Sequence, residues 1–162
     1  MLGMLLSAAP AAAQAPRGLA WGASGVLMFW TDRQDPFDRL GGPGAQVSYL
    51  APNSLGFEFR ATYLVESGFY GLNGVNGELA VTYSIPAGRH LVQLKAGGHG
   101  MLAGDSDGSI WAGGGPYGGG GAIISLGGRI GLQLDLLGRL FVVSGRATFA
   151  PGGAVALVLL PR

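Results

Sequence analysis

The amino-acid sequence predicts an all-β protein, folded as an antiparallel up-and-down barrel of about eight strands. The first observation is segment 55–65, LGFEFRATYLV, in which bulky apolar residues alternate with small or ionisable ones. A period of two residues is typical of a strand, because successive side chains of a strand point to opposite faces. The second observation is that similar segments recur along the chain. The third is that the connections between them alternate between long and short, which favours a meander of hairpins.

Composition narrows the class of protein. The 162 residues are enough for one domain, and 48% are hydrophobic whereas only 12% are charged, about half the usual share for a soluble domain. Glycine is about three times more frequent than average, with 32 residues and no collagen-like period. The net charge of +1 gives no indication of a nucleic-acid or acidic partner. The absence of cysteine excludes disulfides and cysteine-based zinc sites.

The N-terminal segment 1–15, MLGMLLSAAPAAAQA, has features of a signal peptide. Its apolar run at 1–9 is too short to span a bilayer, and Ala13-Gln14-Ala15 has the small-x-small form of a signal-peptidase site. No Lys or Arg precedes the apolar run, and the alternative is a disordered alanine-rich tail. We therefore expect a signal peptide at 1–15 and a barrel domain at 16–162.

The order of strands and connections can be predicted along the whole chain. Strands are expected at 18–30, 44–50, 55–65, 78–85, 89–99, 117–126, 129–137 and 149–160. Long connections are expected at 31–43, 66–76, 103–115 and 140–147, and short turns at 51–54, 86–88 and 127–128. An even number of strands with this alternation is typical of small bacterial outer-membrane barrels, whose short turns and chain ends lie in the periplasm.

The two faces of the predicted strands differ in a way that indicates which one meets lipid. Apart from a few ionisable residues, the polar face consists mostly of Gly, Ala, Ser, Thr and Gln. Such a face is too poor in charge for a solvated exterior but suits a narrow lumen. The apolar face would then meet lipid, and the barrel must close because lipid cannot satisfy open sheet edges. The alternative is a soluble exported lipocalin-like barrel, whose apolar face points inward around an apolar ligand.

Ionisable residues on the polar face predict an ion-pair network across the lumen. Charged groups in a lumen of low dielectric constant must pair, because an unpaired buried charge is costly. The predicted members are Glu58, Arg60, Glu78, Lys95, Arg129 and Asp135. The network is interpreted as a structural plug, and the alternative is a gate for small ions.

Aromatic residues gather near both ends of the predicted strands. Two girdles are predicted, formed by Trp21, Tyr49 and Tyr83 on the periplasmic side and by Trp30, Tyr63 and Trp111 on the outer side. Outer-membrane barrels carry such girdles at the two membrane interfaces. The alternative is the general preference of aromatic residues for strands.

The block at 118–136, GGGGAIISLGGRIGLQLDL, combines a glycine-run strand, a tight turn and an alternating strand. With the signal-like start and the alternating loop lengths, it resembles the small outer-membrane β-barrel families, namely the opacity-type porins and the OmpA-like transmembrane domain. The resemblance implies a lumen plugged by crossed acid–base pairs. The chain departs from these families at its end, Leu159-Leu160-Pro161-Arg162, where they usually carry an aromatic residue that the assembly machinery reads.

These observations predict a non-enzymatic integral outer-membrane barrel with termini in the periplasm and a structural, adhesive or limited passive-permeation role. The expected partners are outer-membrane lipid, lipopolysaccharide and the assembly machinery; we expect a monomer with no nucleic acid, cofactor, metal or catalytic residue. A remote alternative is a lipid A-modifying barrel enzyme. Its histidine would lie on the outer lipid-facing surface, whereas His99 is predicted to face inward and His90 to lie at the periplasmic end.

Overall fold

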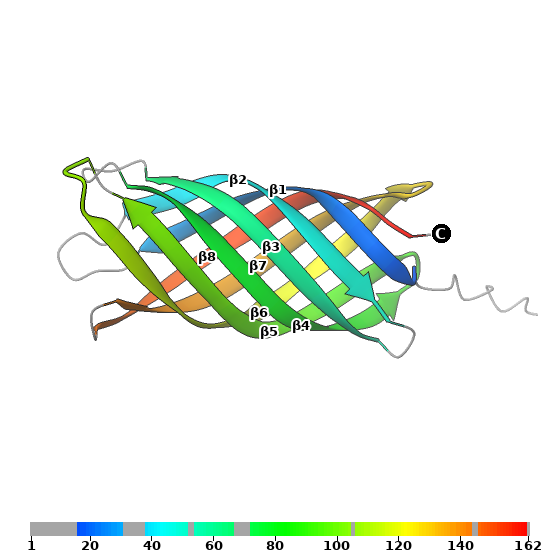
Figure 1. Ribbon diagram of the computed structural model, residues 1–162. Coiled ribbons are helices and arrows are strands. Elements are labelled where there is room, and N and C mark those ends of the chain that lie inside the picture. The colour runs from blue at the N-terminus through cyan, green and yellow to red at the C-terminus, as the bar shows by residue number, and fades with distance from the viewer. Residues whose placement is uncertain are drawn as a thin grey trace, which may run out of the picture.

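The structure is a computed structural model that describes residues 16–30, 38–51, 54–66, 72–104, 106–143 and 146–161, without the side chains of residues 30, 38 and 143. These residues form one closed antiparallel barrel in which each strand pairs with the next and β8 pairs with β1 (Figure 1). The strands are β1 (Gly18–Trp30), β2 (Asp38–Leu50), β3 (Leu55–Glu66), β4 (Asn73–Ala87), β5 (His90–Gly104), β6 (Ile110–Gly127), β7 (Ile130–Val143) and β8 (Arg146–Leu159). No helix among the described residues is long and apolar enough to cross a membrane.

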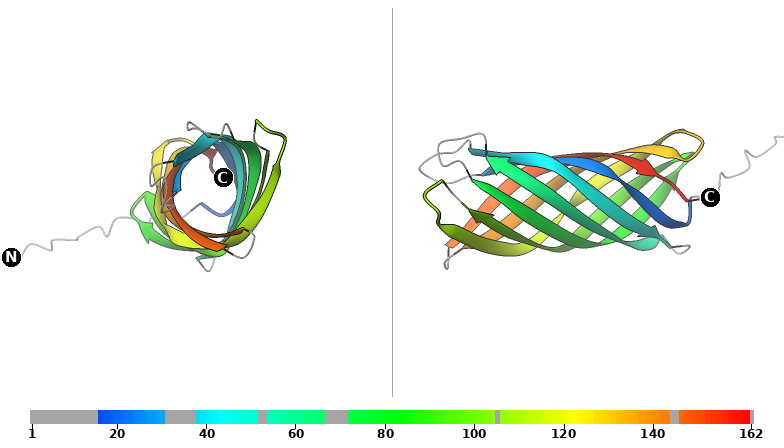
Figure 2. Two further views of the ribbon diagram at one scale, coloured as in Figure 1. Left: turned by 90° about the vertical axis from the view of Figure 1, so that its left-hand side faces the viewer. Right: turned by 45° about the horizontal axis from the view of Figure 1, so that its top comes forward.

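The two ends of the barrel differ in their connections. The connections from β2 to β3, from β4 to β5 and from β6 to β7 lie at the end where β1 begins and β8 ends (Figure 2). We call this the turn end. The connections from β1 to β2, β3 to β4, β5 to β6 and β7 to β8 lie at the opposite end, which we call the loop end.

Strand β3 shows how the alternating sequence produces the two walls of the barrel. Phe57 and Phe59 are 58% and 51% exposed on the outer wall, whereas Glu58 and Arg60 are buried in the lumen. The same alternation runs through β4 and β5, where apolar side chains also point outward. The predicted all-β barrel of eight antiparallel strands is therefore confirmed.

Several predicted strand boundaries are wrong, because the strands continue into segments that were expected to be loops. Strands β2, β4 and β6 begin at Asp38, Asn73 and Ile110, well before their predicted starts. Strand β7 continues to Val143 through most of the predicted 140–147 loop, and β8 runs unbroken through Pro151. Glycine and proline hide the alternation in these segments, but their backbone still pairs with at least one neighbouring strand, as residues 110–113 do with β5 and residues 146–151 do with β7. A closed barrel favours such pairing because it leaves no free edge.

Glycines of the outer and inner walls lie in different surroundings, and β5 offers a matched pair for testing this. A Cβ atom added at Gly97, on the inner wall, would collide with the backbone of Leu79 and Ala80. A Cβ atom at Gly100, on the outer wall of the same strand, would meet nothing within 4 Å. We expect Gly97→Ala to lower the free energy of unfolding by about 1–3 kcal/mol, since overpacking forces the backbone to shift.

The matched substitution Gly100→Ala is expected to change the free energy of unfolding by less than about 0.5 kcal/mol. Urea unfolding of both variants in the same lipid vesicles, followed by tryptophan fluorescence, measures the difference. Equal costs at the two positions would show that the wall can shift to accommodate a methyl group on either side.

Candidate functional site

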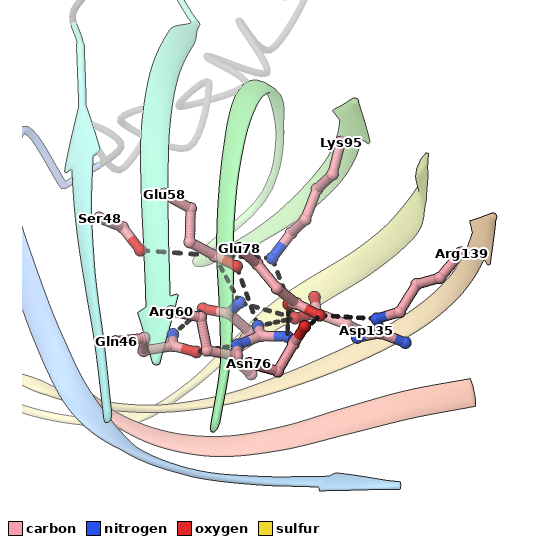
Figure 3. A network of polar contacts seen from close by, with 10 residues as sticks. Gln46, Ser48, Glu58, Arg60, Asn76, Glu78, Lys95, Asp135 and Arg139 are labelled. Carbon is pink, nitrogen blue, oxygen red and sulfur yellow. Dashed lines mark hydrogen bonds and ion pairs between the residues drawn. The ribbon is translucent and has the colours of Figure 1, made fainter. Parts of the chain in front are cut away.

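A buried polar network crosses the lumen, and Arg60 of β3 lies at its centre (Figure 3). The Nη2 atom of Arg60 lies 2.9 Å from Oε1 of Glu58 and 2.5 Å from Oδ2 of Asp135, and Nη1 lies 3.4 Å from Oε2 of Glu78. The Nε atom of Arg60 donates a hydrogen bond of 3.2 Å to Oε1 of Gln46. One guanidinium therefore joins carboxylates from three strands, β3, β4 and β7.

Two further cations complete the network. The Nζ atom of Lys95 lies 2.7 Å from Oε2 of Glu58 and 2.9 Å from Oδ2 of Asp135. The Nε atom of Arg139 lies 2.6 Å from Oε1 of Glu78. Three carboxylates thus face three cations, so the formal charges of the network balance, as a buried environment requires.

Amide side chains extend the network across the lumen. Gln133 donates through Nε2 to Glu58 at 2.9 Å and to Asp135 at 2.9 Å. Gln46 of β2 donates through Nε2 to Oε1 of Gln133 at 2.8 Å, which links β2 directly to β7. The contacts of Gln133 with Glu58 and with Gln46 join strands that are not neighbours in the sheet. The network therefore braces the barrel across its interior, in addition to the ladder hydrogen bonds around its wall.

The network brings together five of the six residues that the sequence predicted for it, namely Glu58, Arg60, Glu78, Lys95 and Asp135. The prediction for Arg129 is wrong, because this residue lies in the β6–β7 turn beyond the rim. It is exposed, and its Nε donates to the carbonyl oxygen of Leu160 at 3.0 Å.

Arg139 belongs to the network although the predicted strand pattern does not include it. The reason is that β7 was predicted to end at residue 137, whereas it continues to Val143. Arg139 follows Asp135 by four residues and therefore points to the same face of β7. Extending the alternation of 129–137 by two residues predicts Arg139 on the inner face of β7.

Apolar side chains fill the lumen on both sides of the network. Strand β5 shows the order, because Leu91, Lys95 and Met101 follow one another from the turn end to the loop end and all three are buried. Leu91 belongs to a cluster with Ala20, Leu50, Ile123, Ala156, Val158 and Leu160. Met101 belongs to a second cluster with Val26, Met28, Leu40, Leu64, Ala103, Phe141, Ala150 and Ala154. The charged layer is therefore enclosed between two apolar layers.

Neither histidine lies on the outer wall near the loop end, where a lipid A-modifying enzyme would need it. His99 is buried in the lumen, where its ring lies edge-on to Phe141 at a centroid distance of 4.2 Å, and its Nε2 lies 3.1 Å from the carbonyl oxygen of Leu140. His90 lies at the turn end, where its Nδ1 accepts a hydrogen bond of 3.2 Å from the amide of Ser125. Among the described residues, no group of three or more His, Cys, Asp or Glu side chains could hold a metal ion.

Four of the six residues predicted for the aromatic girdles lie on the outer wall. Trp21, Tyr49 and Tyr83 are exposed on the outer wall near the turn end, and Tyr63 is exposed on the outer wall near the loop end. The side chain of Trp30 lies outside the described residues.

Trp111 is a correction to the predicted outer girdle. It pairs with the buried Ala103 of β5 and has the same parity on β6 as the buried Tyr117. Its side chain therefore belongs to the inner face at the mouth of the barrel. The reason for the error is that 103–115 was predicted to be a loop, so no strand parity was assigned to it.

A closed eight-stranded antiparallel barrel with an apolar outer wall is the fold of the small bacterial outer-membrane barrels. Solved structures of this class match the chain over most of its length. Neisserial surface protein A matches with a TM-score of 0.72 and 12% identity, covering 88% of this chain and 96% of that one. The outer membrane protein OprG from Pseudomonas aeruginosa matches with a TM-score of 0.59 and 9% identity, covering 91% of this chain and 97% of that one.

The N-terminal β-barrel domain of Pseudomonas aeruginosa OprF matches with a TM-score of 0.57 and 10% identity, covering 89% of this chain and 99% of that domain. At these identities the likeness shows the fold. No protein-family model matches the chain, and no curated protein matches it either.

Proposed function

We propose that this protein is an integral outer-membrane barrel with a structural, non-conducting role in the cell envelope. The observation that carries the proposal is the apolar outer wall, which continues around the closed sheet. Large exposed apolar side chains lie on every strand, for example Leu79 at 60%, Phe57 at 58% and Leu157 at 56% exposure. Soluble monomers rarely expose contiguous apolar surface of this kind, whereas lipid is a good solvent for it.

The distribution of charged and apolar side chains between the two faces of the wall indicates that lipid, and not water, surrounds the barrel. In a lipocalin-like barrel the apolar face would line a ligand cavity and the charged face would meet water. Here the cations and carboxylates of the network are buried, and the leucines and phenylalanines point outward. An apolar ligand would have to displace paired charges from the lumen, which is energetically costly.

The filled lumen supports a structural role over passive permeation. Eight-stranded barrels are just wide enough for side chains to fill. In this barrel two apolar clusters enclose the charged layer, so that an ion crossing the lumen would have to pass both of them. The turn end and the chain ends would face the periplasm, and the loop end would face outward among lipopolysaccharide. The protein would work as a monomer after insertion by the assembly machinery.

Gel mobility of the detergent-extracted protein tests the proposal. We expect the unboiled protein to migrate differently from the boiled protein, because a closed barrel resists detergent until it is heated. We also expect extraction from membranes to require detergent, and the purified protein to show no conductance steps in a planar bilayer.

Release of the protein by carbonate or salt, without a mobility shift, would contradict membrane insertion. A mobility shift combined with stepwise conductance would retain the membrane barrel but replace the structural role with limited permeation of small ions.

A further inference from the structure

The charged residues that do not belong to the network are segregated between the two ends of the barrel. The chain has nine acidic residues, of which three, Glu58, Glu78 and Asp135, belong to the network. By sequence, the other six stand within or next to the connections that join the strands at the loop end: Asp32, Asp35, Asp38, Glu66, Asp105 and Asp107. No acidic residue of the chain is therefore left for the turn end.

The charged residues of the turn end are all arginines. Arg17 precedes β1, Arg89 lies in the β4–β5 turn and Arg129 lies in the β6–β7 turn, and all three are exposed. By sequence, Arg162 follows β8 at the same end. The loop end has three basic residues, Arg33, Arg39 and Arg146, against its six acidic ones. The turn end is therefore cationic, and the loop end has a net negative charge.

Local geometry fixes two of these arginines at the rim. Arg89 and Arg129 each follow a glycine in the left-handed region, Gly88 with φ of 63° and Gly128 with φ of 57°. In both turns the glycine allows the tight reversal, and the arginine is the last residue before the next strand. Because the hydrogen bond from Arg129 to the carbonyl oxygen of Leu160 uses Nε, the two Nη nitrogens of its guanidinium remain for a further partner.

The arginines lie beyond the aromatic side chains of the outer wall, on the side of the turn end. Trp21 is four residues from Arg17, and Tyr83 is six residues from Arg89, both on the turn-end part of their strands. Aromatic side chains of this kind mark the boundary between the acyl chains and the headgroups. The arginines stand four and six residues further along the chain toward the turn end. They would then lie at the depth of the headgroup phosphates.

We propose that Arg17, Arg89 and Arg129, which we call the rim arginines, bind the phosphate groups of anionic phospholipids in the leaflet that surrounds the turn end. The inference rests on the proposed membrane insertion. Guanidinium groups pair well with phosphate, through two parallel hydrogen bonds. A basic side chain at an anionic membrane surface raises the local concentration of anionic lipid about fivefold. Salt reduces this enrichment because it screens the charges.

The test uses the protein refolded into vesicles of phosphatidylcholine with one quarter phosphatidylglycerol of the same acyl chains, then extracted gently in detergent. The ratio of the two lipids that remain bound is measured by mass spectrometry. For the unchanged protein we expect the ratio of bound phosphatidylglycerol to bound phosphatidylcholine to be about fivefold higher than in the vesicles. Arg17→Gln/Arg89→Gln/Arg129→Gln is expected to retain the two lipids in the vesicle ratio. The matched control Arg39→Gln/Arg146→Gln, at the loop end, is expected to keep the enrichment.

The outcomes separate this inference from the proposed function. A protein that inserts, as judged by its gel mobility, but shows equal enrichment with and without the rim arginines would overturn the inference alone. A protein that does not insert would overturn the membrane proposal itself. Inorganic phosphate, compared with sodium chloride of equal ionic strength, provides a further arm. Selective displacement of phosphatidylglycerol by phosphate would identify free phosphate as the occupant and overturn the assignment to lipid.

Discussion

Replacing Arg60 with methionine should lower the free energy of unfolding by about 3–5 kcal/mol, the cost of removing one partner from a buried ion pair. Arg60 contacts Glu58, Glu78 and Asp135, and none of these carboxylates can reach water in the folded barrel. Without Arg60, three buried carboxylates share two cations. The measurement is urea unfolding in lipid vesicles, followed by tryptophan fluorescence and by the folded band on an unboiled gel.

Two comparison variants make this prediction specific. Arg146→Met removes an exposed arginine and is expected to cost less than about 0.5 kcal/mol. Arg60→Met/Asp135→Asn restores the charge balance of the lumen, and we expect it to recover part of the lost stability. If Arg60→Met costs no more than Arg146→Met, the network contributes no more than exposed ion pairs do.

Replacing Leu79 with arginine should also be strongly destabilising, by about 2–4 kcal/mol, because the new side chain would place a charge on the lipid-facing wall near the bilayer midplane. Leu79 lies in the middle of β4 (Asn73–Ala87) and is exposed on the outer wall. In a barrel surrounded by water, the same change would remove an exposed apolar side chain and cost little. The free energy of unfolding in vesicles therefore reports directly on the solvent of the outer wall.

Ile85→Arg provides the matched control on the same strand. Ile85 is exposed on the same wall but lies next to the turn end, where an arginine reaches the interface and costs about 0–1 kcal/mol. A large difference between the two variants supports insertion with the middle of β4 at the bilayer midplane. Two small and equal effects would indicate that water surrounds the wall, and the proposed function would have to be withdrawn.

The alternation of side chains along the sequence by itself determines much of the architecture of this protein. In segment 55–65 it assigned Phe57 and Phe59 to one face and Glu58 and Arg60 to the other, and the structure places them on the outer and inner walls respectively. The period of a strand is a local property, and so it can be read without knowing the partners of the strand. The number of strands and their antiparallel order followed from counting such segments and the connections between them.

The ends of the strands could not be predicted as well, because pairing with a neighbouring strand decides where they end. Residues 110–115 and 138–143 belong to strands although glycine or weak alternation suggested loops. This uncertainty explains why Trp111 was assigned to the wrong face and why Arg139 was missed. In both cases the side-chain direction follows at once when the strand is extended to its observed length.

The sequence by itself thus determined the class of fold, the direction of each wall and the residue types that meet inside. Only the tertiary structure decided which charges pair. The contact of Arg60 with Asp135 joins residues 75 positions apart in the sequence, from strands that are not neighbours in the sheet. The reason is that alternation fixes whether a side chain points inward, whereas barrel closure and strand register fix its height in the lumen and the residue opposite it.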